Sequence, residues 1–274
     1  MTIAAHPGIA SETFGDPGDP AILLVMGAMA SMLWWPEAFC RQLAGRGRFV
    51  IRYDNRDTGL STKYPPGAPS YTFEDMVDDA MRVLDDHDVA KAHVAGMSMG
   101  GMIAQSVALK YPGRISALTV ISSSPLGIDT SGLPGTTQAY QKHSADGAEV
   151  DWSNREQVLG FMVKDARALA STLHPFDEIR TRAMIEADYD RSGGLASATN
   201  HFLLKGGGPQ RTVRDLGVPL LVIHGTADPI FPVEHGETLV GAVPGARLVR
   251  IEGGGHELHR NDWPQIVEAI AEHG

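Results

Sequence analysis

The chain has 274 residues, of which 43% are hydrophobic and 20% charged, as is ordinary for a soluble globular protein. Its 23 basic and 33 acidic side chains give a formal net charge of −10, which argues against nucleic acid as a partner. The one cysteine, Cys40, excludes an intramolecular disulfide, and we expect it to be a buried structural thiol. The N-terminal residues do not resemble a signal peptide, and no apolar run approaches the roughly 18 residues of a membrane span. We therefore expect a cytoplasmic protein without a membrane partner, and its oligomeric state stays open.

Short apolar runs recur along the chain, and each ends at turn residues. They cover residues 21–26, 49–53, 93–95, 118–121, 219–223 and 247–251. Continuous rather than alternating apolar runs are typical of parallel strands buried on both faces. Helical patterns follow between them, at residues 36–45, 73–87, 102–109 and 263–272. This alternation predicts an α/β fold with a doubly wound, mostly parallel sheet, whose ligands bind beyond the carboxyl ends of the strands.

One long segment, residues 126–211, interrupts this rhythm. It shows no strand pattern, begins with Gly, Pro and Thr, and continues with helical patterns at residues 155–172 and 175–188. Residues 206–209 are expected to be an exit linker. We interpret the segment as a helical cap inserted into a core formed by residues 1–125 and 212–274. The cap should lie over the strand ends and shape a pocket.

The segment Gly96-Met97-Ser98-Met99-Gly100 follows an apolar run and opens a helical pattern. This context is typical of a nucleophile elbow, a strained turn that exposes a serine hydroxyl above the sheet. A serine without a catalytic role in a Gly-rich turn is the alternative. A dinucleotide fingerprint fails, because position 98 is Ser where that motif needs Gly. We predict that Ser98 is a nucleophile.

A serine hydroxyl is a weak nucleophile, so it needs a base, and the base needs an orienting acid. In this kind of fold the order along the chain is serine, acid, histidine. Asp228 follows the run that ends at residue 223, and His256 follows the glycines 253–255 after the next run. We predict Asp228 as the acid and His256 as the base. Asp129, after the run 118–121, stays open as a rival acid.

Other polar residues fit catalysis less well. His224 is expected to be a structural hydrogen-bonding residue, His259 falls in a following turn or helix, and His201 is expected on the cap surface or against substrate. Residues 54–61 should form a structural turn below the active site, in which Arg56 and Asp57 could pair. No metal motif of the EF-hand, His-Glu-x-x-His or paired-cysteine type is present, so we predict neither metal nor cofactor.

Two backbone N–H groups are predicted to form the oxyanion hole. One belongs to Met99, directly after the nucleophile, and the other to Ala28, in the loop after the first long apolar run. Apolar side chains flank both donors, and methionine suits an adaptable pocket. The predicted pocket residues are Gly27, Met29, Met32, Trp34, Trp35 and Met97. Core packing is the alternative for these side chains.

Taken together, these motifs resemble the α/β-hydrolase superfamily across essentially the whole chain. Residues 24–27, 35–36, 51–59, 97–100 and 253–256 are similar to aclacinomycin methylesterases and to bacterial macrolide esterases, and residues 27–40 are especially similar to the latter. The resemblance implies hydrolysis of a bulky polyketide-type ester, either a macrolide macrolactone or an anthracycline methyl ester.

The expected activity is therefore that of a serine carboxyl-ester hydrolase acting on a small-molecule ester through an acyl-enzyme. Hydrolysis of simple esters or lactones, C–C bond hydrolysis and perhydrolysis remain alternatives on the same scaffold. A ligand-binding receptor that kept a hydrolase pocket is the alternative outside enzymes. Haloalkane dehalogenase and epoxide hydrolase chemistry is disfavoured, because both need Asp at position 98.

Overall fold

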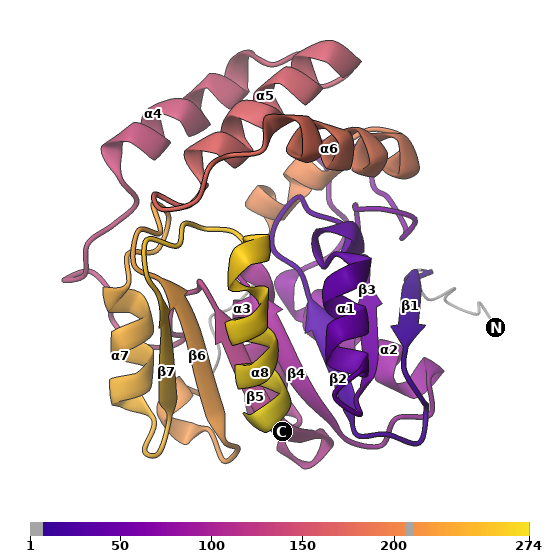
Figure 1. Cartoon of the computed structure of the whole chain (residues 1–274). Coiled ribbons are helices and arrows are strands. Elements are labelled where there is room, and N and C mark those ends of the chain that lie inside the picture. The colour runs from indigo at the N-terminus through magenta and orange to yellow at the C-terminus, as the bar shows by residue number, and fades with distance from the viewer. Residues whose placement is uncertain (1–7, 206–210, 274) are drawn as a thin grey trace.

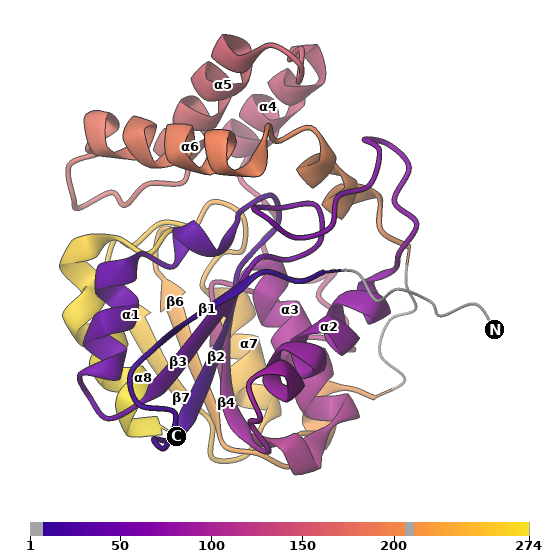
Figure 2. The ribbon, with the colours of Figure 1, turned by 90° about the vertical axis from the view of Figure 1, so that its right-hand side faces the viewer.

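The computed structural model describes residues 8–205 and 211–273, and a seven-stranded sheet forms its centre (Figures 1 and 2). The strand order is β1-β3-β2-β4-β5-β6-β7. The strands are β1 (Ser11–Phe14), β2 (Ala21–Val25), β3 (Phe49–Tyr53), β4 (Ala92–Met97), β5 (Ile115–Ile121), β6 (Leu220–Gly225) and β7 (Arg247–Ile251). Strands β2 to β7 pair in parallel, and β1 joins β3 antiparallel. The predicted mostly parallel α/β sheet is confirmed.

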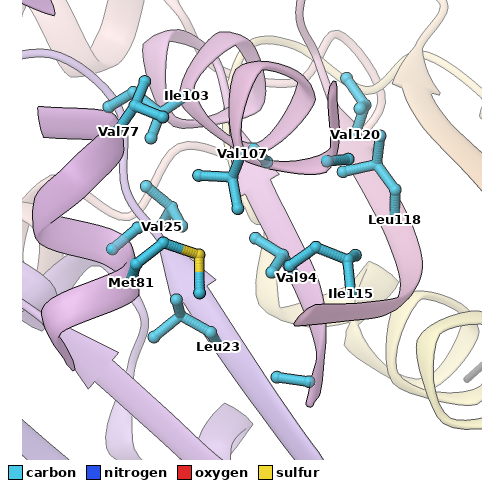
Figure 3. Packing of buried hydrophobic residues seen from close by; sticks show 14 of the residues in the cluster. Leu23, Val25, Val77, Met81, Val94, Ile103, Val107, Ile115, Leu118 and Val120 are labelled. Atoms are coloured by element: carbon cyan, nitrogen blue, oxygen red, sulfur yellow. The ribbon is translucent and has the colours of Figure 1, made fainter. Parts of the chain in front are cut away.

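Five helices cover the two faces of the sheet. Helices α1 (Glu37–Ala44) and α8 (Trp263–His273) pack together on one face, while α2 (Phe73–Asp86), α3 (Met99–Lys110) and α7 (Glu234–Ala242) cover the other. Strand side chains alternate between the faces: Leu23 and Val25 pack with α2 and α3, whereas Ile22 and Leu24 pack with α1 and α8. Figure 3 shows the buried side chains between the strands and helices α2 and α3, among them Val77 and Ile103. Burial on both faces explains the continuous apolar runs.

The strand order changes direction at β2. After β2 the chain moves to β3 on one side, and it returns to β4 on the other. Val25 at the end of β2 therefore lies beside Gly96 of β4. Loops that leave two neighbouring strands at such a switch point diverge, and ligands of this fold class bind between them. The loops after β2 and β4 are those that carry Gly27 and Ser98.

Helices α4 (Gln138–Asp146), α5 (Arg155–Ala168) and α6 (Glu178–Ser192) form a separate layer at the top of Figure 1. The 3₁₀ helix η4 (Ser197–Leu203) follows α6. This layer has a small core of its own, in which Val158, Leu159 and Ile185 are buried. Its hydrogen bonds reach the loops after β2 and β7, so it covers the carboxyl edge of the sheet. We call residues 126–211 the cap; these bounds stay a prediction, and the exit linker at 206–209 lies outside the described residues.

The remaining elements are short 3₁₀ helices: η1 (Met32–Trp34), η2 (Pro112–Arg114), η3 (Gly147–Glu149), η5 (Val213–Asp215) and η6 (Arg260–Asp262). Across residues 8–205 and 211–273, none of the helices combines the length and the apolar character that crossing a bilayer requires.

Candidate active site

Ser98 occupies a strained turn between β4 and α3. Its φ is 56° and its ψ is −123°, a conformation that non-glycine residues rarely adopt. Close packing imposes this turn: a Cβ on Gly96 would lie 2.1 Å from the carbonyl oxygen of Gly100, and one on Gly100 would lie 2.2 Å from that of Val25. The Ser98 carbonyl accepts a hydrogen bond from the Ser123 hydroxyl at 2.8 Å. The turn holds Ser98 partly exposed at the carboxyl edge of the sheet.

The loop after β2, residues 26–32, lies against this turn, and we call it the oxyanion loop after the role predicted for Ala28. A Cβ on Gly27 would lie 3.0 Å from the Ser98 Cβ and 3.6 Å from its Oγ, so a side chain at this position would crowd Ser98. Ala28 follows directly and is partly exposed. Within the described chain, the N–H of Ala28 donates to no protein group, and Met99 is the first residue of α3, where N–H groups lack helical partners. Among the described residues, neither predicted oxyanion donor therefore has an acceptor, and the two donors belong to the residues that follow Gly27 and Ser98.

Asp228 and His256 are in direct contact at the ends of β6 and β7. His256 Nδ1 lies 2.7 Å from Asp228 Oδ2, and both side chains are buried. The other carboxylate oxygen of Asp228 accepts the backbone N–H groups of Ile230 at 2.8 Å and Phe231 at 2.9 Å. A carboxylate acceptor requires the proton on Nδ1, which leaves Nε2 as the nitrogen able to accept a proton.

Burial tends to raise the pKa of the Asp228 carboxyl. The charge and hydrogen bond of His256, together with the Phe231 N–H, outweigh that effect, and the net pKa lies below the ordinary value. Asp228 therefore stays ionised at neutral pH. An ionised carboxylate beside Nδ1–H stabilises the imidazolium that forms when Nε2 takes a proton.

The rival acid, Asp129, occupies a different environment. It is exposed, and its Oδ1 accepts the backbone N–H of Ser131 at 2.9 Å. His224, as expected, has a structural role: its Nε2 donates to the Phe231 carbonyl at 2.7 Å and thereby supports the turn that holds Asp228.

The loop after β3 differs from the prediction in one pairing. Arg56 does not pair with Asp57; it makes two hydrogen bonds to Asp79 of α2, at 2.5 and 2.9 Å. Asp57 instead accepts from the Tyr71 hydroxyl at 2.7 Å and from Asn200 at 3.0 Å. Adjacent side chains on this tight turn diverge, so each finds its partner in another element.

The predicted pocket residues fall into two groups. Met29 and Trp34 are partly buried and pack against the apolar cluster of the cap. Trp35 has no exposed surface and packs on Phe39 with ring centroids 5.6 Å apart, so its prediction as a pocket residue is wrong. Met32, 2% exposed, is likewise a core residue, because the turn of η1 directs its side chain inward. Met97 packs in the same core cluster as Trp35.

One hollow lies elsewhere on the cap. It has a volume of about 320 Å³ and is lined by residues of α4, η3 and α5, including His143, Glu149 and Phe161. None of the predicted site residues contributes to it, so we do not assign the substrate to it.

His201 also lies elsewhere than the sequence predicts. It was expected on the surface or against substrate, but it is 6% exposed. Its Nδ1 accepts the backbone N–H of Met29 at 3.0 Å, and its Nε2 donates to the Arg56 carbonyl at 2.7 Å. Its partners are backbone groups of two distant loops, which no local sequence pattern indicates.

Two histidines and an aspartate meet where the cap touches the core, with their possible ligand atoms within 4.8 Å of one another. His174 Nε2 lies 3.1 Å from Asp262 Oδ1, and the His174 ring stacks on His259 with centroids 4.4 Å apart and planes 14° apart. A metal ion lies near the plane of each imidazole that binds it, along the nitrogen lone pair. Nearly parallel stacked rings cannot direct both lone pairs at one ion, so we assign no metal to this cluster.

The architecture and the strained serine turn define the class of protein. Residues 20–261 match the family model described as alpha/beta hydrolase fold, and the chain belongs to this family. Solved structures agree on the fold: an esterase from Rhodococcus sp. covers 98% of this chain with a TM-score of 0.77 at 20% identity. The enol-lactonase from Burkholderia xenovorans covers 97% with a TM-score of 0.74 at 19% identity.

Two curated relatives are similar over nearly their whole length. The chain is 34% identical to rhodomycin D methylesterase DauP of Streptomyces sp. over 285 aligned residues, which cover 96% of this chain and 93% of the relative. It is also 34% identical to rhodomycin D methylesterase DnrP of Streptomyces peucetius, with the same coverage. A shorter match, 36% identical over 124 residues, is to the carbamate hydrolase RutD of Caulobacter vibrioides, itself described as putative. The chain is an ester hydrolase of this family.

Proposed function

We propose that the chain is a serine carboxyl-ester hydrolase in which Ser98, His256 and Asp228 act as a catalytic triad. The observation that carries the proposal is the 2.7 Å contact between His256 Nδ1 and Asp228, at the same edge of the sheet as the strained Ser98 turn. The fixed tautomer of His256 leaves Nε2 as the base, and Ser98 is the partly exposed nucleophile.

The first half of the reaction forms an acyl-enzyme. Ser98 Oγ attacks the ester carbonyl carbon while His256 Nε2 takes the hydroxyl proton. The N–H groups of Ala28 and Met99 stabilise the negative charge that develops on the carbonyl oxygen. When the tetrahedral intermediate collapses, the imidazolium gives its proton to the departing alkoxide, which leaves as an alcohol.

The second half regenerates the enzyme. A water molecule gives a proton to His256 Nε2 and attacks the acyl carbon, and the same two N–H groups stabilise the second oxyanion. Collapse of this intermediate releases the carboxylic acid, and Ser98 takes its proton back from His256. Asp228 stays ionised throughout and keeps the imidazole oriented.

For the substrate we propose a methyl ester on a bulky, largely apolar polyketide-type molecule. The two relatives that match over nearly their whole length are both named rhodomycin D methylesterase. Met29 and Trp34, which are partly buried against the cap and follow the predicted oxyanion donor Ala28, support a large apolar acyl group. Opening of a macrolide macrolactone is the second candidate, because of the similarity of residues 27–40 noted above.

Replacing Ser98 by Ala tests the nucleophile. We expect the variant to fold like the wild type and to lose at least about 1,000-fold in kcat on p-nitrophenyl esters, because the oxyanion donors alone form no acyl-enzyme. A fluorophosphonate should label the wild type and not the variant, as intact-protein mass spectrometry would show. Near-wild-type turnover by the variant would overturn the assignment.

Mass spectrometry of products identifies the ester. Incubation with anthracycline methyl esters should release methanol and leave the free acid, whereas a macrolide would gain one water without losing a fragment if its ring opened. Turnover of macrolides alone would replace the methyl-ester proposal. Tight binding without turnover of any ester would indicate a ligand-binding receptor.

A further inference from the structure

We infer that His201, which belongs to the cap, is a positioning residue that holds the oxyanion loop in its catalytic conformation. The inference rests on the proposed function, since it concerns the oxyanion hole of the same reaction.

The hydrogen bonds of His201 define its protonation. The Arg56 carbonyl can only accept, so Nε2 carries the proton that it receives at 2.7 Å. The Met29 N–H can only donate, so Nδ1 presents a lone pair at 3.0 Å. Both nitrogens are thus satisfied by backbone groups, and only the neutral ring with its proton on Nε2 meets both demands. Burial, the largest influence on this ring, lowers the pKa of His201, which agrees with the neutral form.

The bond to Met29 acts on a strained part of the loop. Met29 has φ 63°, in the left-handed region that is strained for a non-glycine residue. Such a conformation persists only where surrounding contacts over-determine it. His201 supplies a contact at the strained residue itself, from an element 172 positions away in sequence.

The same bond fixes the neighbouring Ala28. The peptide between Ala28 and Met29 is planar, so holding the Met29 N–H also fixes the direction of the Ala28 carbonyl. On its other side, Gly27 is in close contact with Ser98. Ala28 is therefore held from both ends, and because the Met29 N–H is already engaged, the Ala28 N–H is the one left to meet the substrate oxyanion.

Among the residues that the structure describes, hydrogen bonds from the core hold this loop at other points. Asn55 donates to the Met26 carbonyl at 3.0 Å, and Asp54 accepts the Met32 N–H at 2.8 Å. These two bonds hold the ends of the oxyanion loop. Its centre at Met29 is held by His201, so the donor becomes aligned only when the last part of the cap is seated on the core.

Three substitutions of His201 distinguish the effects of its two hydrogen bonds. His201→Asn places an amide oxygen near the Nδ1 position, so it can keep the Met29 bond and lose the Arg56 bond. His201→Gln reaches the Nε2 position with its amide nitrogen, so it can keep the Arg56 bond and lose the Met29 bond. His201→Ala removes both. As a matched control, His93→Gln replaces a buried histidine that bonds Thr119 inside the sheet, away from the carboxyl edge.

We expect kcat on a p-nitrophenyl ester to fall about 10- to 100-fold for the Ala and Gln variants, with KM changed less than threefold, because a misaligned donor acts on the transition state. The Asn variant should retain kcat within about fivefold, and His93→Gln should retain it per folded molecule. Thermal unfolding curves give the temperature range in which each variant is folded, and kcat is compared within that range. Equal losses for Asn and Ala, or wild-type kcat in folded Ala, would overturn the inference. Full activity of Ser98→Ala would instead defeat the proposed function.

Discussion

At the scale of single residues, His256 is held by two unrelated interactions. Its side chain bonds Asp228, and its backbone N–H donates to the carbonyl of Leu169 in the cap at 2.8 Å. Gly255 makes the second contact possible, since a Cβ there would lie 2.0 Å from that carbonyl oxygen. The position of His256 therefore depends on the cap, whereas its ring orientation and tautomer depend on Asp228.

Exchanging carboxylates for amides tests the choice of acid. Asp228→Asn should lower kcat/KM by about 1,000- to 10,000-fold, because an amide can donate to Nδ1 and so stabilise the wrong tautomer of His256. Asp129→Asn is the matched control, since its oxygen can still accept the Ser131 N–H, and it should leave kcat/KM within twofold. Steady-state kinetics on one ester decide between them. A larger loss from Asp129→Asn would move the acid to the end of β5.

At the scale of elements, helix α6 anchors the cap to the oxyanion loop. Asp188 of α6 is buried and accepts the indole N–H of Trp34 at 2.8 Å and the backbone N–H of Ser31 at 3.5 Å. Nearby, Arg191 pairs with the buried Asp54 at 2.8 Å. The cap is thus joined to the core by buried polar contacts as well as by the His201 bonds.

Two substitutions on α6 measure how much the contacts of Asp188 contribute to the free energy of unfolding. Asp188→Ala should lower the free energy of unfolding by about 1–3 kcal/mol, because it leaves the partly buried Trp34 indole N–H without its acceptor. Asp190→Ala, two residues along the same helix, removes an exposed carboxylate paired with Arg155 and should cost less than about 1 kcal/mol. Urea unfolding followed by tryptophan fluorescence provides both values. Equal effects would mean that α6 is not anchored through Asp188.

Most of the strands that the sequence reveals are buried on both faces. Strands β2 to β6 lie inside the sheet and contain predicted apolar runs. The predicted run at residues 247–251 forms the edge strand β7, which is buried only at Ile251. Strand β1 has no such run: it is a four-residue edge strand with Ser11, Glu12 and Thr13 exposed or partly exposed. Helix α7 was also missed, since its sequence has a weak apolar stripe. In the site, the strand-end residues were predictable, but the contacts of His201 and Asp188 depend on how the cap docks.

At the scale of the whole molecule, buried histidines make stability depend on pH. His93 is 1% exposed, and burial lowers its pKa to about 3. In the unfolded chain its pKa returns to about 6.5. Between these values the unfolded state binds the extra proton, so this contribution to stability is intact above about pH 6.5 and is lost as the pH falls.

Comparing the wild type with His93→Gln isolates that contribution from the other titrating groups. Between pH 7 and pH 5, the free energy of unfolding of the wild type should fall by about 2 kcal/mol relative to the variant, at 1.4 kcal/mol per pH unit below 6.5. Urea unfolding at both pH values checks this. A difference that does not change with pH would mean that His93 is protonated in the folded protein or never buried.

Because Cys40 is the one cysteine of the chain, a fluorescent label on the cap can be placed at a single introduced cysteine. Cys40 is fully buried on α1, and burial raises its pKa to about 12, so almost none of it is the reactive thiolate at neutral pH. The chain is in effect free of reactive cysteine without any substitution. A cysteine introduced on the outer side of α6, where Ile179 is 87% exposed, would therefore take a maleimide dye at one site only. Fluorescence from such a dye could follow the cap during turnover in an otherwise native enzyme.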